Sequence, residues 1–154
     1  MTSDGSSVEV QGSFAAGHDV TGALVAVDES RALVGEFVLS ASLDSRAEAM
    51  LCLVLEELIT NALRHGGAEG PRAVTVNLRA VDGFVDLEFD DAGSPFDPRV
   101  DRPPDPREGQ YAESGPGGLG WPLVLHYFEI VDYRRVEERN TVVLRSRPLW
   151  NSGG

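Results

Sequence analysis

The sequence predicts an α+β fold, a two-layer sandwich with helices packed on one face of a mixed, largely antiparallel sheet. Two observations carry this prediction. A long amphipathic helical segment precedes two hairpins of alternating apolar and polar residues, and no parallel β–α–β pattern surrounds the one glycine-rich turn that opens a helix. The order read from the chain is helix, helix, hairpin, loop, helix, hairpin.

The length of 154 residues fits one domain, and 42% hydrophobic residues are enough to build its core. We assign residues 8–150 to this domain, with residues 1–7 as a flexible N-terminus and residues 151–154 as a tail. Residues 94–118 are rich in proline, glycine and charge, and they are expected to form a lid loop.

The first half of the chain contains two segments that compete for one strand. Val8–Phe14 and Ala23–Val27 both carry strand-forming residues, and the sequence does not decide which one joins the sheet. Asp28–Ser40 predicts a helix that Asp28 is able to cap. Arg46–His65 predicts the longest helix.

In the second half of the chain, apolar and polar residues alternate more clearly along the predicted strands. Val74, Val76 and Leu78 share one face of a strand, and an Asp-Gly pair then marks a hairpin turn. The remaining predicted elements are strands at Ala73–Val81, Phe84–Asp90, Glu129–Val136 and Thr141–Arg147 and a helix at Leu119–Phe128.

Charge and composition exclude several kinds of site. Thirteen basic and twenty-five acidic residues give a net charge of −12, which disfavours nucleic acid as a partner. All thirteen basic residues are arginine, so lysine-dependent phosphate loops and Schiff-base chemistry are excluded. One cysteine and three well-separated histidines predict neither a disulfide nor a zinc site. With neither a signal peptide nor a long apolar run, we expect a cytoplasmic protein without membrane contact.

The first candidate site motif lies on the longest helix. On a helical projection Asn61 lies about 40° from Glu57, and His65 lies about 80° from Glu57. From Glu57 to His65 the three side chains therefore lie progressively closer to the edge of the apolar stripe. An asparagine carbonyl suits magnesium, and a carboxylate one turn away is able to accept a proton. Ordinary surface polarity is the alternative interpretation, because this spacing is common.

The second motif is Asp91-Ala92-Gly93, at the end of a strand. By alternation, the Asp91 carboxylate continues the apolar face of Val85, Leu87 and Phe89 and therefore points toward the core. Such a carboxylate needs hydrogen-bond donors, and the exocyclic amine of adenine is one. Gly93 lets a ring approach the backbone. A simple turn cap is the alternative.

The third motif is the glycine-rich segment Gly115–Gly120, which opens the last helix. Glycine amides at a helix N-terminus are able to bind phosphate without lysine. A flexible loop is the alternative.

The three motifs together, in this order, resemble the GHKL ATPase superfamily, whose ATP-binding domain is called the Bergerat fold. The resemblance covers roughly Asp28–Arg147. More narrowly, the segments EELITNALRHG, DDAGSPFDP and GGLGWPLV resemble the stand-alone bacterial anti-sigma factor serine kinases.

The resemblance implies a role for each matching residue. Glu57 is implied as the general base and Asn61 as the ligand of Mg2+. Asp91 is implied to contact the adenine amine, with Gly93 beside the base. Further nucleotide contacts are implied for His65, which has a capping role as its alternative, and for Gly117, Gly118, Leu119, Gly120 and Thr141.

This sequence departs from the family pattern at two places. Asn140-Thr141 stands where a Gly-Thr pair is usual. No basic residue lies within the glycine-rich segment, and the loop residues Arg99, Arg102 and Arg107 are either its replacements or solvated charges.

The resemblance implies an ATP- and Mg2+-dependent protein-serine kinase. Its partners would be a sigma factor and an anti-anti-sigma (antagonist) protein that it phosphorylates, and it would form a homodimer. The missing basic residue leaves an alternative function, a non-catalytic module that binds its regulator under nucleotide control.

Overall fold

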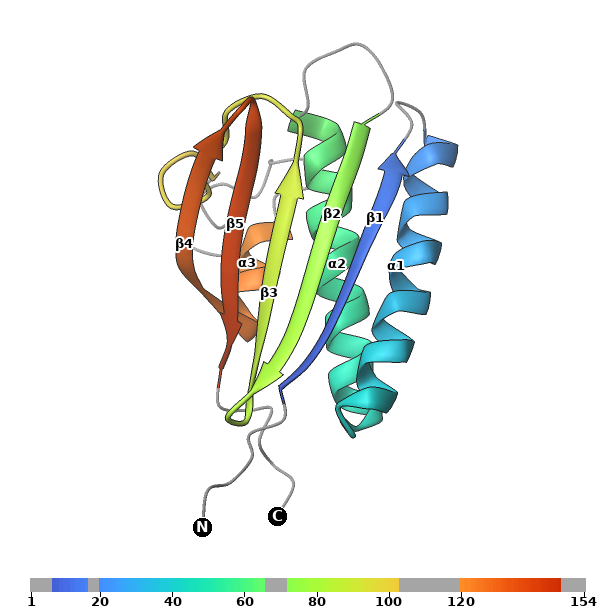
Figure 1. Cartoon of the computed structure of the whole chain (residues 1–154). Helices are drawn as coiled ribbons and strands as arrows, with labels where there is room; N and C mark the ends of the chain where they lie inside the picture. The colour runs from blue at the N-terminus through green and yellow to red at the C-terminus, as the bar shows by residue number, and fades with distance from the viewer. Residues whose placement is uncertain (1–6, 17–19, 66–71, 103–119, 148–154) are drawn as a thin grey trace, which may run out of the picture.

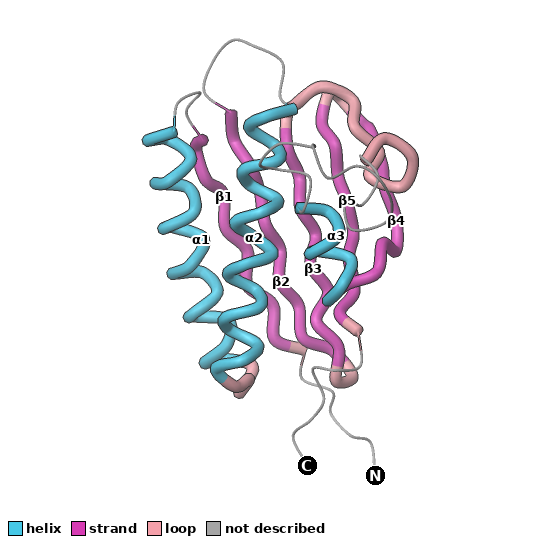
Figure 2. The backbone as a smooth tube through the Cα atoms, turned by 180° about the vertical axis from the view of Figure 1, so that it is seen from behind, coloured by secondary structure: helices cyan, strands magenta, loops and turns pink. Residues whose placement is uncertain are grey.

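The computed structural model describes residues 7–16, 20–65, 72–102 and 120–147. Within them, five strands form one sheet in the order β1-β2-β3-β5-β4. Three helices lie on the same face of this sheet, with α1 and α2 over one half and α3 over the other (Figure 1 and Figure 2). The elements are β1 (Val8–Ala16), α1 (Val20–Ser40), α2 (Ser45–His65), β2 (Arg72–Val81), β3 (Phe84–Asp91), α3 (Gly120–Tyr127), β4 (Phe128–Val136) and β5 (Arg139–Ser146).

This architecture confirms the predicted α+β sandwich. One detail differs, because all four strand pairings among the described residues are antiparallel, so no parallel pair makes the sheet mixed. Among the described helices, none is long and apolar enough to cross a membrane.

The two competing N-terminal segments are resolved by the structure. Val8–Ala16 pairs with β2 as an edge strand, whereas Ala23–Val27 lies inside α1. The helix therefore begins at Val20, and Asp28 is an exposed interior residue rather than its cap. Burial follows the helical period here, since Ala26, Val27 and Ser30 face the core.

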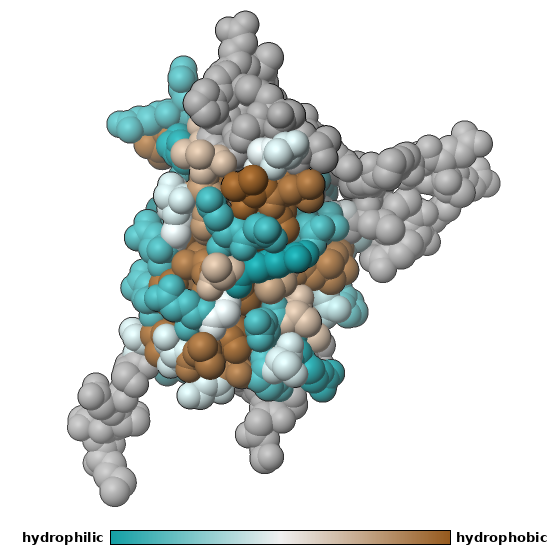
Figure 3. All heavy atoms as spheres, turned by 90° about the vertical axis from the view of Figure 1, so that its right-hand side faces the viewer, coloured by the Kyte–Doolittle hydropathy of each residue, from teal (hydrophilic) through white to brown (hydrophobic). Residues whose placement is uncertain are grey.

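The outward face of α1 remains partly apolar. Leu24, Val25 and Leu39 are exposed, and Figure 3, which views this side, shows hydrophobic residues interspersed with hydrophilic ones. Apolar residues on both sides of the helix weaken its amphipathic pattern, which is why its first two turns resembled a strand in the sequence.

Gly35 offers a test of the helix itself. A Cβ at this position would meet nothing within 4 Å. Because glycine in a helix interior costs about 1 kcal/mol relative to alanine, we expect Gly35→Ala to raise the free energy of unfolding by about that amount. Urea denaturation measures the change, and an unaltered or lowered midpoint would contradict it.

The α2 helix positions the first candidate motif. Asp44 caps it, since its Oδ1 accepts a hydrogen bond from the Ala47 amide at 2.9 Å. Leu51, Val54, Leu55 and Leu58 are buried in the core. This fixes the rotation of the helix, and Glu57 and Asn61 consequently lie beside the start of α3.

The β2–β3 hairpin positions the second motif. Its two-residue turn has positive φ at both Asp82 (50°) and Gly83 (80°), the geometry of a type I′ turn. The turn sets the register that buries Val85, Leu87 and Phe89. The next residue on this face is Asp91, as the alternation predicted.

The opposite face of the sheet is open and charged. Arg145 donates hydrogen bonds to both Asp86 carboxylate oxygens, at 2.7 and 3.0 Å, and Arg79 lies 3.5 Å from the same group. The hydrogen bonds from Arg145 hold the pKa of Asp86 below its usual value. Arg134 forms a similar, more exposed pair with Glu88 on this face.

Candidate functional site

A cavity of about 40 Å³ lies between α2, α3 and the end of β3. It brings together residues from six parts of the chain, among them Leu58, Asn61, Asp91, Phe96, Trp121 and Asn140. Two of the predicted site residues, Asn61 and Asp91, therefore line one cavity although thirty positions separate them in the sequence.

Asp91 presents one oxygen to this cavity. Its Oδ1 accepts hydrogen bonds from the Gly93 amide at 2.8 Å and from Asn140 Nδ2 at 3.2 Å. Among the described residues no donor reaches Oδ2, so this oxygen keeps its capacity to accept a hydrogen bond. Burial raises the pKa of Asp91, although these two hydrogen bonds oppose the effect. A ligand with an N–H donor would satisfy the group.

Asn140 orients Asp91 and the chain that follows it. This buried asparagine faces Asp91 directly across the β3–β5 pairing. Besides its bond to Asp91, its Nδ2 donates to the Ser94 carbonyl oxygen at 2.8 Å. Both amide hydrogens are thereby used, and the carboxylate of Asp91 is held in one orientation.

The carbonyl oxygen of the Asn140 side chain accepts three hydrogen bonds. Its Oδ1 accepts from the Phe96 amide at 3.2 Å, from the Tyr133 hydroxyl at 2.6 Å and from Arg135 Nη1 at 3.1 Å. Arg135 also donates to the Gly93 carbonyl oxygen at 2.7 Å. The segment after β3 is thus fixed to β4 and β5 by the side chains of Asn140 and Arg135.

The prediction for Thr141 is wrong. The β3–β5 register pairs Thr141 with Asp90, and its Oγ1 donates to Asp90 Oδ2 at 2.8 Å. Successive strand residues point to opposite faces, so Thr141 lies on the open face of the sheet and Asn140 on the cavity side. Parity relative to Asp91, given the register, would have identified Asn140.

The glycine at the start of α3 lies directly against the α2 motif. A Cβ on Gly120 would come within 2.7 Å of Asn61 Nδ2 and 3.1 Å of Glu57 Oε2. Asn61 is 9% exposed, and its Nδ2 has no hydrogen-bond partner among the described residues. Glu57, Asn61 and the start of α3 therefore lie close together.

Gly120→Ala tests this close approach. The added methyl group would displace Asn61 or Glu57, and overpacking of this kind typically costs about 1–3 kcal/mol. We expect a lower free energy of unfolding and weaker nucleotide binding. Gly35→Ala is the matched control, because the same substitution there meets open space. Chemical denaturation and calorimetric titration measure the two effects, and a Gly120→Ala protein that matches the wild type in both would contradict the packing.

An aromatic pair forms the apolar wall of the cavity. The Phe96 and Trp121 rings stack with centroids 6.4 Å apart and an interplanar angle of 27°. Trp121 is 6% exposed, and its Nε1 has no hydrogen-bond partner among the described residues. Sequence reasoning assigned neither ring to the site. The signal available was the position of Trp121 immediately after the glycine-rich segment.

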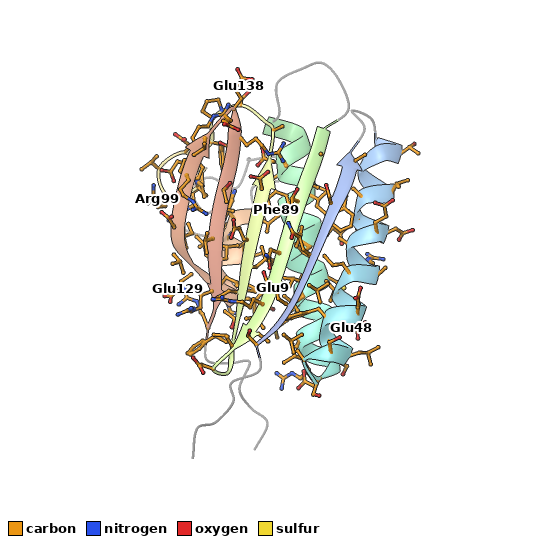
Figure 4. All side chains as sticks on the ribbon, viewed as in Figure 1. Glu9, Glu48, Phe89, Arg99, Glu129 and Glu138 are labelled. Atoms are coloured by element: carbon orange, nitrogen blue, oxygen red, sulfur yellow. The ribbon has the colours of Figure 1, made fainter. Side chains whose placement is uncertain are left out.

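Several predicted site residues lie outside what the structure describes. These are Gly117, Gly118, Leu119, Arg107 and the side chain of His65. Arg99 and Arg102 are described and have partners. Arg99 binds Asp97 at 2.9 Å and lies over the Tyr133 ring, and Arg102 donates to the Pro98 carbonyl oxygen at 2.9 Å (Figure 4 labels Arg99, in the loop beside β4).

The residues present fit a magnesium–nucleotide complex better than a protein-only metal site. Among the described residues, no group of three or more His, Cys, Asp or Glu side chains could hold a metal. Asn61 is 9% exposed and lines the cavity, and its side-chain carbonyl oxygen is a suitable magnesium ligand when phosphates supply the others. Asn61 would hold the ion, with Glu57 beside it.

Comparison with known proteins agrees with this geometry. The family model of the histidine kinase-like ATPase domain matches residues 20–146. The serine/threonine-protein kinase BtrW of Bordetella bronchiseptica is 29% identical over 103 residues, which are 66% of this chain and 72% of BtrW. The match to the family model includes every residue that lines the cavity.

Proposed function

The chain belongs to the family of histidine kinase-like ATPase domains, and on this premise we propose that it is an ATP-dependent protein serine/threonine kinase. One observation carries the proposal: the available Asp91 oxygen and the buried Asn61 amide line the same cavity, next to the N-terminus of α3. This supports a role for Asp91 as the hydrogen-bond acceptor for adenine, for Asn61 as the magnesium ligand and for the start of α3 as the phosphate-binding end.

The chemistry assigned to each residue follows from its place. Asp91 Oδ2 would accept a hydrogen bond from the adenine amine, and Asn61 would bind Mg2+. The magnesium ion bound with ATP would neutralise charge on the phosphates. The Glu57 carboxylate would accept the proton of a substrate serine hydroxyl as the serine oxygen bonds to the γ-phosphorus and the bond to the β–γ bridging oxygen breaks. The products would be phosphoserine and ADP.

For the partner we propose an anti-anti-sigma protein as the phosphorylated substrate and a sigma factor as the protein bound in alternation. The support is the resemblance of the EELITNALRHG and DDAGSPFDP segments to anti-sigma factor kinases. The similarity to BtrW supports the kinase half of this proposal.

A second function is favoured by one observation. The described arginines of the loop after β3, Arg99 and Arg102, are engaged by Asp97 and by the Pro98 carbonyl oxygen. Both guanidinium groups are therefore engaged within the loop itself. Under this alternative the chain binds a regulator under nucleotide control without transferring phosphate.

One set of measurements separates these functions. Calorimetric titration with ATP, with and without Mg2+, tests binding. An assay for ADP, followed by mass spectrometry of the antagonist protein encoded nearest to this chain, tests turnover. A kinase gives all three signals, and a nucleotide-controlled module gives binding alone. Absence of ATP binding in the presence of Mg2+ would contradict both.

A further inference from the structure

The Trp121 side chain carries a buried hydrogen-bond donor that the fold leaves without a partner. Among the described residues, only this indole nitrogen and Asn61 Nδ2 are buried side-chain polar atoms with no hydrogen bond. An indole N–H is a donor and never an acceptor. Leaving it buried and unpaired destabilises the protein, and such groups in native structures call for an explanation.

Core packing alone does not explain a tryptophan at this position. The other buried side chain of α3 is Val124, which is wholly apolar and 0% exposed. A phenylalanine at position 121 would also supply an aromatic ring against Phe96 and would leave no unpaired donor. The feature that distinguishes tryptophan here is its N–H group.

The position of Trp121 points to a ligand. It lines the same cavity as Asp91 and Asn61, and it follows Gly120, the residue in contact with Glu57 and Asn61. The indole therefore lines the same cavity as the residue proposed to bind the base, and it is next in the chain to the glycine that lies against Glu57 and Asn61.

The Trp121 N–H group is buried, so a ligand reaches it only if the wall of the cavity moves. Phe96 and Trp121 form the apolar wall, and Phe96 is partly exposed on a loop. Separation of these two rings would open the cavity and expose the indole N–H to the ligand.

We propose that Trp121 is a nucleotide-binding residue. Its Nε1–H donates a hydrogen bond to an acceptor atom of the bound adenine nucleotide, either a purine ring nitrogen or a ribose oxygen. This inference rests on the ATP binding of the proposed function and adds to it a residue that positions the nucleotide between Asp91 and the phosphate site.

The test removes the donor while retaining the ring. In a Trp150→Phe background, which leaves Trp121 as the sole tryptophan, Trp121 is replaced by phenylalanine or by benzothienylalanine, an isostere with sulfur in place of N–H. We expect the Kd of Mg2+–ATP to rise about tenfold for both replacements, the loss of one hydrogen bond. We also expect the emission of Trp121 to change when ATP is added to the parent protein.

Val124→Ala is the control. It removes buried apolar volume from the same helix without touching the cavity, so it should lower stability and leave the Kd of the folded protein unchanged. ATP analogues that lack one ring nitrogen or one ribose hydroxyl identify the acceptor: the analogue that binds the parent and the donor-free proteins equally well lacks the partner of Trp121.

The outcomes separate this inference from the proposed function. If the parent protein binds ATP and the benzothienylalanine protein binds it equally tightly, Trp121 has only a packing role and the inference is overturned. If the parent protein does not bind ATP, the proposed function is overturned, and the inference that rests on it is overturned as well. The isostere keeps the test decisive even if Trp121→Phe fails to fold.

Discussion

Asp91→Asn is expected to reduce the affinity for ATP by at least about 30-fold. Asparagine is nearly isosteric, and its carbonyl oxygen can still accept the bonds from the Gly93 amide and from Asn140. Its NH2 group would then replace the oxygen that faces the cavity and would oppose the adenine amine, donor against donor. Leaving both donors unpaired costs about 1–3 kcal/mol for each. Calorimetric titration with Mg2+–ATP measures the loss.

The same substitution should alter the pH dependence of stability. Burial raises the pKa of Asp91 above its ordinary value of 3.8, so the folded protein binds this proton more tightly than the unfolded chain does. The stabilisation from that proton is fully present below pH 3.8 and is lost as the pH rises through the folded pKa. Because asparagine does not titrate, the Asp91→Asn protein lacks this pH-dependent loss of stability. Denaturation at a series of pH values should show a smaller decline above pH 4 in the variant.

Asp90→Asn provides the matched control. Asp90 is the neighbouring carboxylate, but it lies on the open face of the sheet and binds Arg139 and Thr141. We expect this variant to lose some stability and to bind ATP as the wild type does. Equal losses of affinity in the two variants would mean that Asp91 has no special contact with the base.

Glu57→Ala is expected to slow phosphate transfer to the substrate serine by about 10²- to 10⁴-fold, the usual contribution of a general base. The affinity for ATP should change little, because Glu57 is assigned to the acceptor hydroxyl and not to the nucleotide. Transfer of radioactive phosphate from ATP measures the rate, and calorimetry measures the affinity.

Glu56→Ala is the control for this variant. The adjacent glutamate lies 3.5 Å from Arg31 of α1, on the outer side of the helix pair. Its replacement should leave the transfer rate unchanged. If both variants transfer phosphate as fast as the wild type, Glu57 is not the base.

Local patterns in the sequence predicted most of the elements. The α2 helix and the β2–β3 hairpin follow their apolar periodicity within one or two residues, and strand parity correctly turned Asp91 toward the core. These features depend only on neighbours in the chain. The start of α1 was ambiguous, because β-branched and leucine residues occur on its exposed side as well as its buried side.

The rest of the site depends on contacts between distant segments. Whether Asn140 or Thr141 faces the cavity depends on the β3–β5 register, and a shift of one residue would reverse the answer. The packing of Trp121 on Phe96 depends on how α3 docks beside the loop. The residue pattern within a single segment predicts neither the β3–β5 register nor the packing of Trp121 on Phe96.

The attachment of the segment after β3 has a consequence for how this chain tolerates insertions and deletions. From Asp91 to Phe96, backbone groups of Gly93, Ser94 and Phe96 are held at fixed partners on β3, β4 and β5. Adding or deleting a residue within this stretch would break several of these attachments at once. Changes in chain length are therefore expected to be tolerated poorly between Asp91 and Phe96, which makes this stretch a poor place to graft a tag or a foreign peptide.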